Sequence, residues 1–182
     1  MRQALTPINE PFSAEVAEIF KEYPQQDGYI LQLFRVFANS LRFLKKGTVN
    51  LLDRDGPLSL RERELVILRV CANNNCEYEW GVHVAVFAAK AGISADQIAA
   101  TCSKNHEAEC WNIGDALLIR VVDELSTSAR LSPETKSQFE TFWDLEQQLE
   151  ILALAGNYHT ISFVANVAGI EGEGFGARFP SD

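Results

Sequence analysis

The stretch LSLRERELVILRVCANNNCEYEWGVH, residues 58–83, decides the fold of this chain. It reads as two helices joined by a short asparagine turn. In the first helix Glu64 shares one side with Ile67, Leu68 and Cys71, because residues three, four and seven apart lie on the same face. We therefore expect the carboxylate of Glu64 to face the core, with Cys71 continuing the apolar stripe as a core residue.

The second helix brings three ionisable side chains to one side. Cys76, Glu79 and His83 are spaced by three and four residues and share a face with Trp80 and Phe87. The polar atoms of both helices then meet between two apolar faces. Because burying several ionisable groups together is costly unless they pair, the sequence predicts a functional cluster here.

The start of the second helix makes Cys76 a candidate nucleophile. Unpaired N–H groups and the positive end of the helix dipole favour the thiolate, which is the attacking form, and the asparagine turn is expected to supply the cap. His83 can take or deliver a proton near neutral pH, with Glu64 or Glu79 as its partner. Two carboxylates beside one imidazole repel each other, so we expect one of them to hold its proton.

Helix-start and helix-stop signals recur along the chain. Capping boxes occur at Ser59 with Glu62, Ser94 with Gln97, and Asp144 with Gln147. Proline follows Ser132 at a further start, and Gly92 and Gly169 stand where a left-handed C-terminal cap is wanted. Strand signals are almost absent. The sequence predicts an all-α fold of about eight helices, at roughly 14–22, 28–40, 41–52, 60–72, 76–91, 95–102, 111–127 and 133–168, the last with a break near 143.

Length and charge limit the class of protein. With 182 residues, 47% of them hydrophobic, the chain suffices for one domain over residues 1–182 with a well-developed core. The net charge of -9 opposes binding to a phosphate backbone, so no nucleic-acid partner is expected. The first twelve residues carry no apolar run and no stretch of eighteen apolar residues exists, which predicts neither a signal peptide nor a membrane span.

The four cysteines indicate a reducing environment. Without secretion features, reduced thiols in the cytoplasm are the expectation. Cys102, His106 and Cys110 are spaced by four, which on a continuous helix points them the same way, but three such ligands make an incomplete zinc site. Residues 103–107 look more like a solvated loop between helices.

The C-terminal third suggests an oligomer that ends in an arm. The run 145–168 is apolar on most sides, so it is expected to be central or buried in a subunit interface, and a homo-oligomer follows. The segment from 170 to 182 has too much glycine for a helix. We therefore expect an extended arm with the side chain of Phe175 docked.

These residues carry a resemblance to a known family. The segments 58–69 and 76–83 resemble the core motif, here residues 58–92, of the carboxymuconolactone decarboxylase and alkylhydroperoxidase D-like superfamily. Leu33-Phe34-Arg35 and the segment 154–159, with Asn166, also resemble longer members. The resemblance implies an all-helical fold that assembles into dimers, trimers or hexamers, with active sites near subunit contacts and no cofactor.

In peroxidase members of that superfamily a glutamate, two cysteines three apart and a histidine form a proton relay around a redox thiol pair. Glu64 matches the glutamate, Cys76 the first cysteine and His83 the histidine, whereas Glu79 stands where the second cysteine would be. The disulfide cycle is therefore unavailable at that site. Peroxide turnover needs a sulfenic acid on Cys76 that an external thiol reductant resolves, and Cys71, on a different helix, is an uncertain substitute.

Three functions remain open from the sequence. The first is a peroxiredoxin-type, antioxidant oxidoreductase with Cys76 as nucleophile, His83 as proton relay, Glu64 as its base and Glu79 tuning it. The second is a cofactor-free decarboxylase or lyase acting on a small carboxymuconolactone-like acid, in which His83 and a carboxylate move protons and Cys76 only lines the pocket. The third is a helical binding or assembly protein without turnover.

Further residues are candidates for the walls of the pocket around a small-molecule substrate. They are Trp80, for which core packing is the stronger expectation, Tyr158 and His159. A zinc or iron site made by Glu64, Glu79 and His83 is a minor variant, and the main prediction is a site without a metal.

Overall fold

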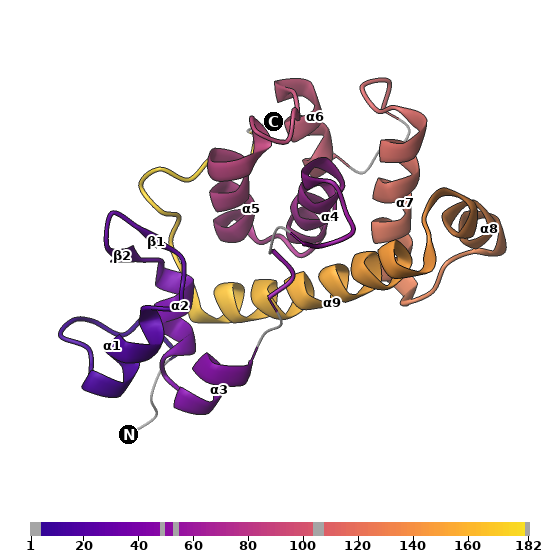
Figure 1. Cartoon of the computed structure of the whole chain (residues 1–182). Helices are drawn as coiled ribbons and strands as arrows, with labels where there is room; N and C mark the ends of the chain where they lie inside the picture. Colours follow the sequence, from indigo (N-terminus) through magenta and orange to yellow (C-terminus); the bar gives the residue numbers. More distant parts are fainter. Residues whose placement is uncertain (1–4, 48–49, 53–54, 104–107, 181–182) are drawn as a thin grey trace.

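The computed structural model describes residues 5–47, 50–52, 55–103 and 108–180. In this part of the chain nine α-helices are joined by one π-helical segment and one minimal hairpin (Figure 1). The prediction of an all-α fold is therefore confirmed. In chain order the elements are α1 (Ala14–Phe20), β1 (Gln25–Gln26), β2 (Tyr29–Ile30), α2 (Gln32–Phe37), α3 (Leu41–Lys46), α4 (Leu60–Asn73), α5 (Glu77–His83), η1 (Val84–Ala88), α6 (Ala95–Cys102), α7 (Ile113–Ser128), α8 (Pro133–Phe142) and α9 (Leu145–Ala168).

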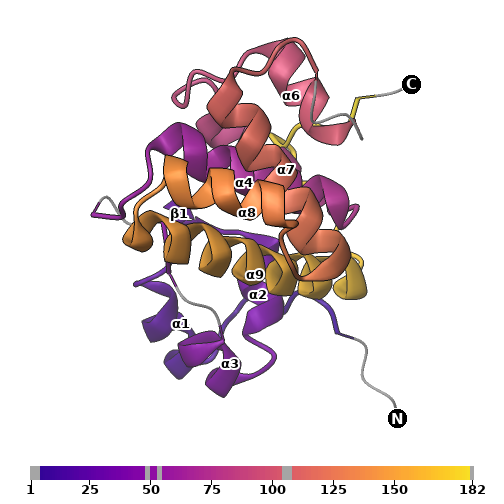
Figure 2. The same ribbon diagram turned by 90° about the vertical axis from the view of Figure 1, so that its right-hand side faces the viewer.

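Two helices organise the fold. The buried helix α4 packs against α5, α6, α7 and α9, and α9 also contacts α2, α5 and α8. Figures 1 and 2 show α9 as a long helix between α1–α3 on one side and α4–α7 on the other. The functional residues therefore lie where α4, α5 and α9 meet, next to the N-terminal helices.

Local capping explains why the helices begin where they do. All three predicted capping boxes form, at Ser59, Ser94 and Asp144, and each has both of its reciprocal hydrogen bonds. Gly92 and Gly169 adopt positive φ angles of 64° and 59°, as predicted for left-handed helix ends. The break near residue 143 is also seen, since α8 and α9 are separate helices.

The N-terminal region departs from the prediction. The helix expected at 28–40 is wrong at its start, because a hairpin pairs Gln25 with Ile30 before α2 begins at residue 32. Its turn, Asp27-Gly28, has positive φ angles of 50° and 83°, and Asp-Gly is the dipeptide that such turns prefer. Similarly, α3 ends at Lys46 instead of extending to residue 52, and the described residues 50–52 are not helical.

The long helix α9 has one inward and one outward apolar face. Ile151, Leu154 and Tyr158 are buried on the inward face. By length and composition α9 is the one described helix that suffices to cross a membrane, but core helices pass the same test, and its contacts are those of a core helix. The outward face exposes large apolar side chains, namely Leu145, Leu149, Leu152, Phe163 and Val167.

The C-terminal segment 170–180 forms the predicted arm, but it is anchored differently from the prediction. Phe175 remains 38% exposed, so its expected docking is wrong. Instead, the Glu173 carboxylate accepts hydrogen bonds from the hydroxyl groups of Tyr78 and Tyr29 and from the backbone N–H of Gln32. The rings of Phe179 and Trp80 pack with their centroids 5.1 Å apart and their planes tilted by 58°, so the arm crosses α5 (Figure 1).

The loop predicted at 103–107 and His106 lie mostly outside the described residues. Cys102 ends α6, and Cys110 lies in a turn before α7, so the continuous helix that a zinc site would need is not formed over the described part.

Candidate active site

Glu64 lies on the buried face of α4, as its spacing from the apolar residues predicts, and its side chain is fully buried. Its Oε2 atom is 2.6 Å from Nδ1 of His83 on α5. The guanidinium of Arg63 lies 3.4 Å from the other carboxylate oxygen. The first predicted pair, a carboxylate and an imidazole from two helices, is therefore formed.

The other nitrogen of His83 points to two further groups. Nε2 lies 3.0 Å from the hydroxyl of Tyr158 on α9 and 3.4 Å from Oε1 of Glu79, one turn earlier on α5. Burial opposes charging of this imidazole, but the carboxylates of Glu64 and Glu79 outweigh it and raise the pKa of His83 to about 9. At neutral pH His83 is therefore an imidazolium that donates hydrogen bonds from both nitrogens.

Tyr158 is a neutral hydrogen-bonding group of this cluster. Its side chain is almost fully buried, and burial together with the charges of Glu79 and Glu64 raises the pKa of the phenol well above its usual range. Its oxygen accepts from Nε2 of His83, which leaves its O–H available to donate elsewhere. The cluster thus forms a chain of polar groups from Glu64 through His83 to Tyr158 and Glu79.

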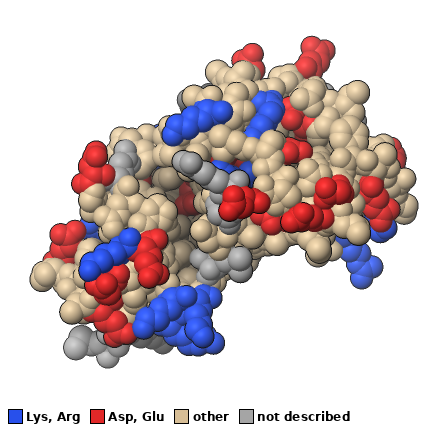
Figure 3. Space-filling view, in the orientation of Figure 1, with Lys and Arg blue, Asp and Glu red and all other residues tan. Residues whose placement is uncertain are grey.

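A cavity of about 710 Å³ lies at the outer end of this chain, and Glu79 and Tyr158 line it. Oε2 of Glu79 is buried without a hydrogen-bond partner among the described residues, so it is available to a bound molecule. Lys45 of α3 also lines the cavity, and Figure 3 shows Lys and Arg side chains gathered where α3 lies. Apolar side chains make most of the remaining wall, among them Leu33, Phe34, Phe37, Leu44, Leu52 and Ile161.

The two helices of the site lie within the segment that comparison with known proteins identifies. Residues 41–118 match the model of the carboxymuconolactone decarboxylase family. This segment of the chain is therefore similar to that family. A comparison with curated proteins gave no match. The matched segment runs from α3 into α7 and contains Glu64 and His83, whereas Tyr158 and the C-terminal arm lie beyond it.

Cys76, within the matched segment, is itself the N-cap residue of α5. The expected asparagine cap is wrong, because Asn74 is instead the C-cap of α4. A hydrogen bond with the thiol of Cys71 lowers the pKa of Cys76, and the backbone N–H of Glu79 acts in the same direction, while burial opposes both. Both hydrogen bonds favour the thiolate form of Cys76.

Cys76 does not contact His83 directly. The two residues lie two turns apart on one face of the helix, and Glu79 stands between them, facing Cys76 with its backbone N–H and His83 with its carboxylate. Neither Cys76 nor Cys71 lines the 710 Å³ cavity. Thiol and imidazole are therefore linked through Glu79.

Two predicted pocket residues have other roles. Trp80 is buried against Phe179 and donates its indole N–H to the hydroxyl of Thr101 at 2.9 Å, which is the core role expected for it. His159 lies 3.4 Å from the hydroxyl of Ser126 and packs against Phe163, away from the cavity, so its placement in the pocket wall is wrong. One residue along α9 from Tyr158 is a rotation of about 100°, which turns the side chain to a different face.

The carboxylates do not make a metal site with the histidine. Glu64 approaches Nδ1 and Glu79 approaches Nε2, so the two carboxylates lie at opposite edges of the imidazole. Among the described residues no three His, Cys, Asp or Glu side chains are placed to hold a metal ion. The minor metal variant therefore does not fit the geometry.

The sequence reasoning missed two features of the site. The hydroxyl of Ser162, one turn after Tyr158 on α9, lies close to both Cys71 and Cys76 and lowers the pKa of each thiol. The spacing of four between Tyr158 and Ser162 was a signal for this shared face. The second feature is the contribution of α2 and α3 to the cavity wall, which no local pattern in their sequence indicates.

Proposed function

We propose that this protein is a thiol-dependent peroxidase-like oxidoreductase with Cys76 as its nucleophile. The thiolate attacks the outer oxygen of a hydroperoxide, the O–O bond breaks, and Cys76 becomes a sulfenic acid. The departing alkoxide takes a proton and leaves as an alcohol. A thiol reductant then returns Cys76 to the thiol.

The observation that carries this proposal is the lowered pKa of the buried Cys76 thiol. Burial alone raises the pKa of a cysteine. The pKa of the buried Cys76 thiol is lowered instead, because specific partners favour its anion. Structural cysteines in apolar surroundings are inert by comparison. Cys102, for example, has its pKa raised by burial.

The relay supplies the proton that the leaving group needs. His83 is an imidazolium at neutral pH and touches both Glu79 and Tyr158. Glu79 lies between this acid and the thiol, so a proton given up by Nε2 can pass toward the alkoxide through its carboxylate. Glu64 keeps accepting the hydrogen bond from Nδ1, so its charge favours the return of a proton from solvent to Nε2.

The test is the consumption of hydroperoxide by purified protein in the presence of a thiol reductant. We expect Cys76→Ser to lose this activity, because serine lacks a redox-active sulfur. Cys102→Ser is the matched control and should keep the wild-type rate, since Cys102 lies on α6 away from the cluster. An active Cys76→Ser variant would remove the proposal, and inactivity of the wild-type protein toward all peroxides and lactones would favour a binding protein without turnover.

A second candidate function is a cofactor-free lyase on a small carboxylated lactone. It is favoured by the cavity, which is lined by proton-carrying groups, Glu79 and Tyr158, and not by a cysteine, and which has Lys45 available for a substrate carboxylate. In that case Cys76→Ala should keep activity on such a lactone while His83→Gln loses it. The opposite pattern on peroxide would support the oxidoreductase.

We also propose that the protein is a homo-oligomer that works in a reducing compartment such as the cytoplasm. The exposed apolar face of α9, which includes Leu145, Leu149 and Val167, is the surface that supports assembly.

 

Leu145 and Val167 are each 77% exposed, and Leu149 is 69% exposed. These side chains are exposed in the described part of the chain. A second copy packed against them would remove apolar surface from water. Sedimentation of the purified protein tests the assembly. A monomer at micromolar concentration would contradict it.

A further inference from the structure

The turn between α4 and α5 brings two cysteines together. The backbone N–H of Cys76 donates to the carbonyl of Cys71 at 2.8 Å, and that of Asn75 donates to the carbonyl of Ala72 at 3.0 Å. Asn75 has a left-handed φ of 51°. This pair of bonds around a left-handed residue is the Schellman motif, in which the side chains at the positions of Cys71 and Cys76 contact each other.

The backbone bond also limits how far apart the two residues can be. With N and O 2.8 Å apart, standard bond lengths keep the two Cα atoms within about 6.7 Å of each other. Disulfides join Cα atoms about 4.4–6.8 Å apart, so the turn has the reach for one. Both thiols are free and fully buried, so thiols in solution do not compete with the pair.

We propose that Cys71 and Cys76 form a redox-active pair in which Cys71 resolves oxidised Cys76 through an intramolecular disulfide. The inference rests on the proposed function, which supplies the sulfenic acid on Cys76. The sulfur of Cys71 attacks the sulfur of Cys76, the S–S bond forms and the S–O bond breaks. The hydroxyl of the sulfenic acid takes the proton of the Cys71 thiol and leaves as water.

The environments of the two thiols assign their order of reaction. Burial raises the pKa of Cys71 well above its usual range, so Cys71 stays protonated while Cys76 is the better thiolate. The protonated Cys71 donates a hydrogen bond to the sulfur of Cys76. Cys76 therefore meets the peroxide first, and Cys71 acts second.

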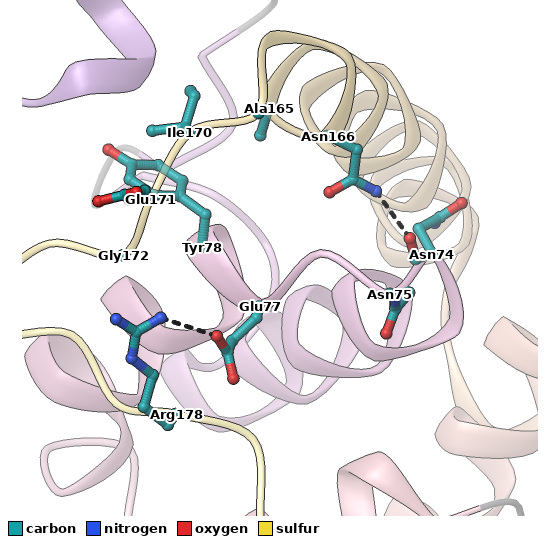
Figure 4. A pocket seen from close by; sticks show the side chains of 11 residues that line it. Asn74, Asn75, Glu77, Tyr78, Ala165, Asn166, Ile170, Glu171, Gly172 and Arg178 are labelled. Atoms are coloured by element: carbon teal, nitrogen blue, oxygen red, sulfur yellow. Dashed lines mark hydrogen bonds and ion pairs between the residues drawn. The ribbon is translucent and has the colours of Figure 1, made fainter.

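A pocket lies beside the turn, and its lining includes the neighbours of Cys76 but neither cysteine. It has a volume of about 800 Å³ and is lined by the residues on both sides of Cys76 (Figure 4). Arg178 of the arm closes one side through its ion pair with Glu77, and the amide of Asn166 donates to the carbonyl of Asn74 on the other. A dithiol reductant completes the cycle, because it returns both cysteines to thiols by exchange and becomes a disulfide itself.

Peptide mapping of the full chain tests the pair. Reduced protein is treated with cumene hydroperoxide or, separately, with the disulfide-forming reagent diamide, and free thiols are then alkylated. Trypsin releases residues 70–90 as one peptide that holds Cys71 and Cys76 but neither of the other two cysteines. We expect this peptide to carry no alkyl group and to be lighter by two hydrogen atoms than its reduced form.

Two variants identify the role of each sulfur. In Cys71→Ser we expect loss of the disulfide and, in its place, a sulfenic acid on Cys76 that dimedone traps. The Cys102→Ser control should give the wild-type peptide. If Cys71→Ser does not fold, mapping of the wild-type protein alone still decides the question.

The outcomes separate this inference from the proposed function. Oxidation of Cys76 by peroxide while Cys71 remains open to alkylation would overturn the pair and leave the peroxidase standing. A disulfide with diamide but no reaction with hydroperoxide would support the pair and reject the peroxidase. Alkylation of both cysteines after both treatments would overturn the pair.

Discussion

Raising the pH from 6 to 9.5 should destabilise the protein through His83. Its pKa is about 9 in the folded protein, because the carboxylates of Glu64 and Glu79 outweigh the opposing effect of burial, and about 6.5 in an unfolded chain. The folded state therefore holds a proton that the unfolded state releases across this range. The stabilisation is complete below pH 6.5 and is lost as the pH rises through 9.

The size of the effect follows from the same two values. A change from about 6.5 to about 9 corresponds to about 3 kcal/mol of unfolding free energy. Because the imidazole is only 3% exposed, screening by solvent does not reduce this figure much. A total stability of about 5–15 kcal/mol is typical of a domain, so a loss of this size is easily measured.

Urea unfolding at pH 6 and pH 9.5 measures this loss. The thiol of Cys76 acts in the opposite direction, since a lowered pKa adds stability as the pH rises toward 9, so the experiment uses a Cys76→Ser background. Glu64→Gln in that background should remove most of the pH dependence, because it removes the nearest charge. An unfolding free energy that stays constant between pH 6.5 and 9 in the parent would refute the assigned charge of His83.

Three further predictions concern contacts around the site. Gly81→Ala should destabilise the fold and speed proteolysis of the C-terminal arm, because the added Cβ collides with the carbonyl of Ala177 at a cost of about 1–3 kcal/mol that exceeds the helix-propensity gain of about 1 kcal/mol. Glu173→Gln should lower the unfolding free energy by about 1–3 kcal/mol, measured in urea, because an amide cannot accept all three hydrogen bonds of the carboxylate. Arg69→Ala should cost about 3–5 kcal/mol in the same assay, because it leaves the carboxylate of Asp123 without the guanidinium that it bonds at 2.6 Å.

Local sequence signals predicted the helical part of this fold well. The capping boxes at Ser59, Ser94 and Asp144 depend on contacts within four residues, so they can be read without knowing the rest of the molecule. The pairing of Glu64 with His83 was accessible for a similar reason. Helical spacing placed each on the buried face of its own helix, and a short connection forces adjacent helices to pack.

Features that depend on contacts between distant segments could not be predicted in this way. The cavity wall from α2 and α3 depends on how these helices dock on α9, and no periodicity within them specifies that contact. Likewise, α5 continues into a π-helical segment at residues 84–88, which the pattern at 76–91 did not distinguish from an α-helix. His159 was assigned to the pocket by its position beside Tyr158, although neighbours on a helix face different directions.

The replacement of a motif cysteine by Glu79 changes both the charge and the geometry of the site. A carboxylate at this position gives His83 a second acidic neighbour, which adds to the effect of Glu64 in raising the pKa of the imidazole. It also removes the nearest sulfur from Cys76 along α5. Cys71 supplies a sulfur from the other side of the turn, on a backbone connection already fixed by the Schellman bonds. In the proposed disulfide the two cysteines stay on this turn, so we expect the contacts of His83 with Glu64 and Glu79 to persist through the proposed redox cycle.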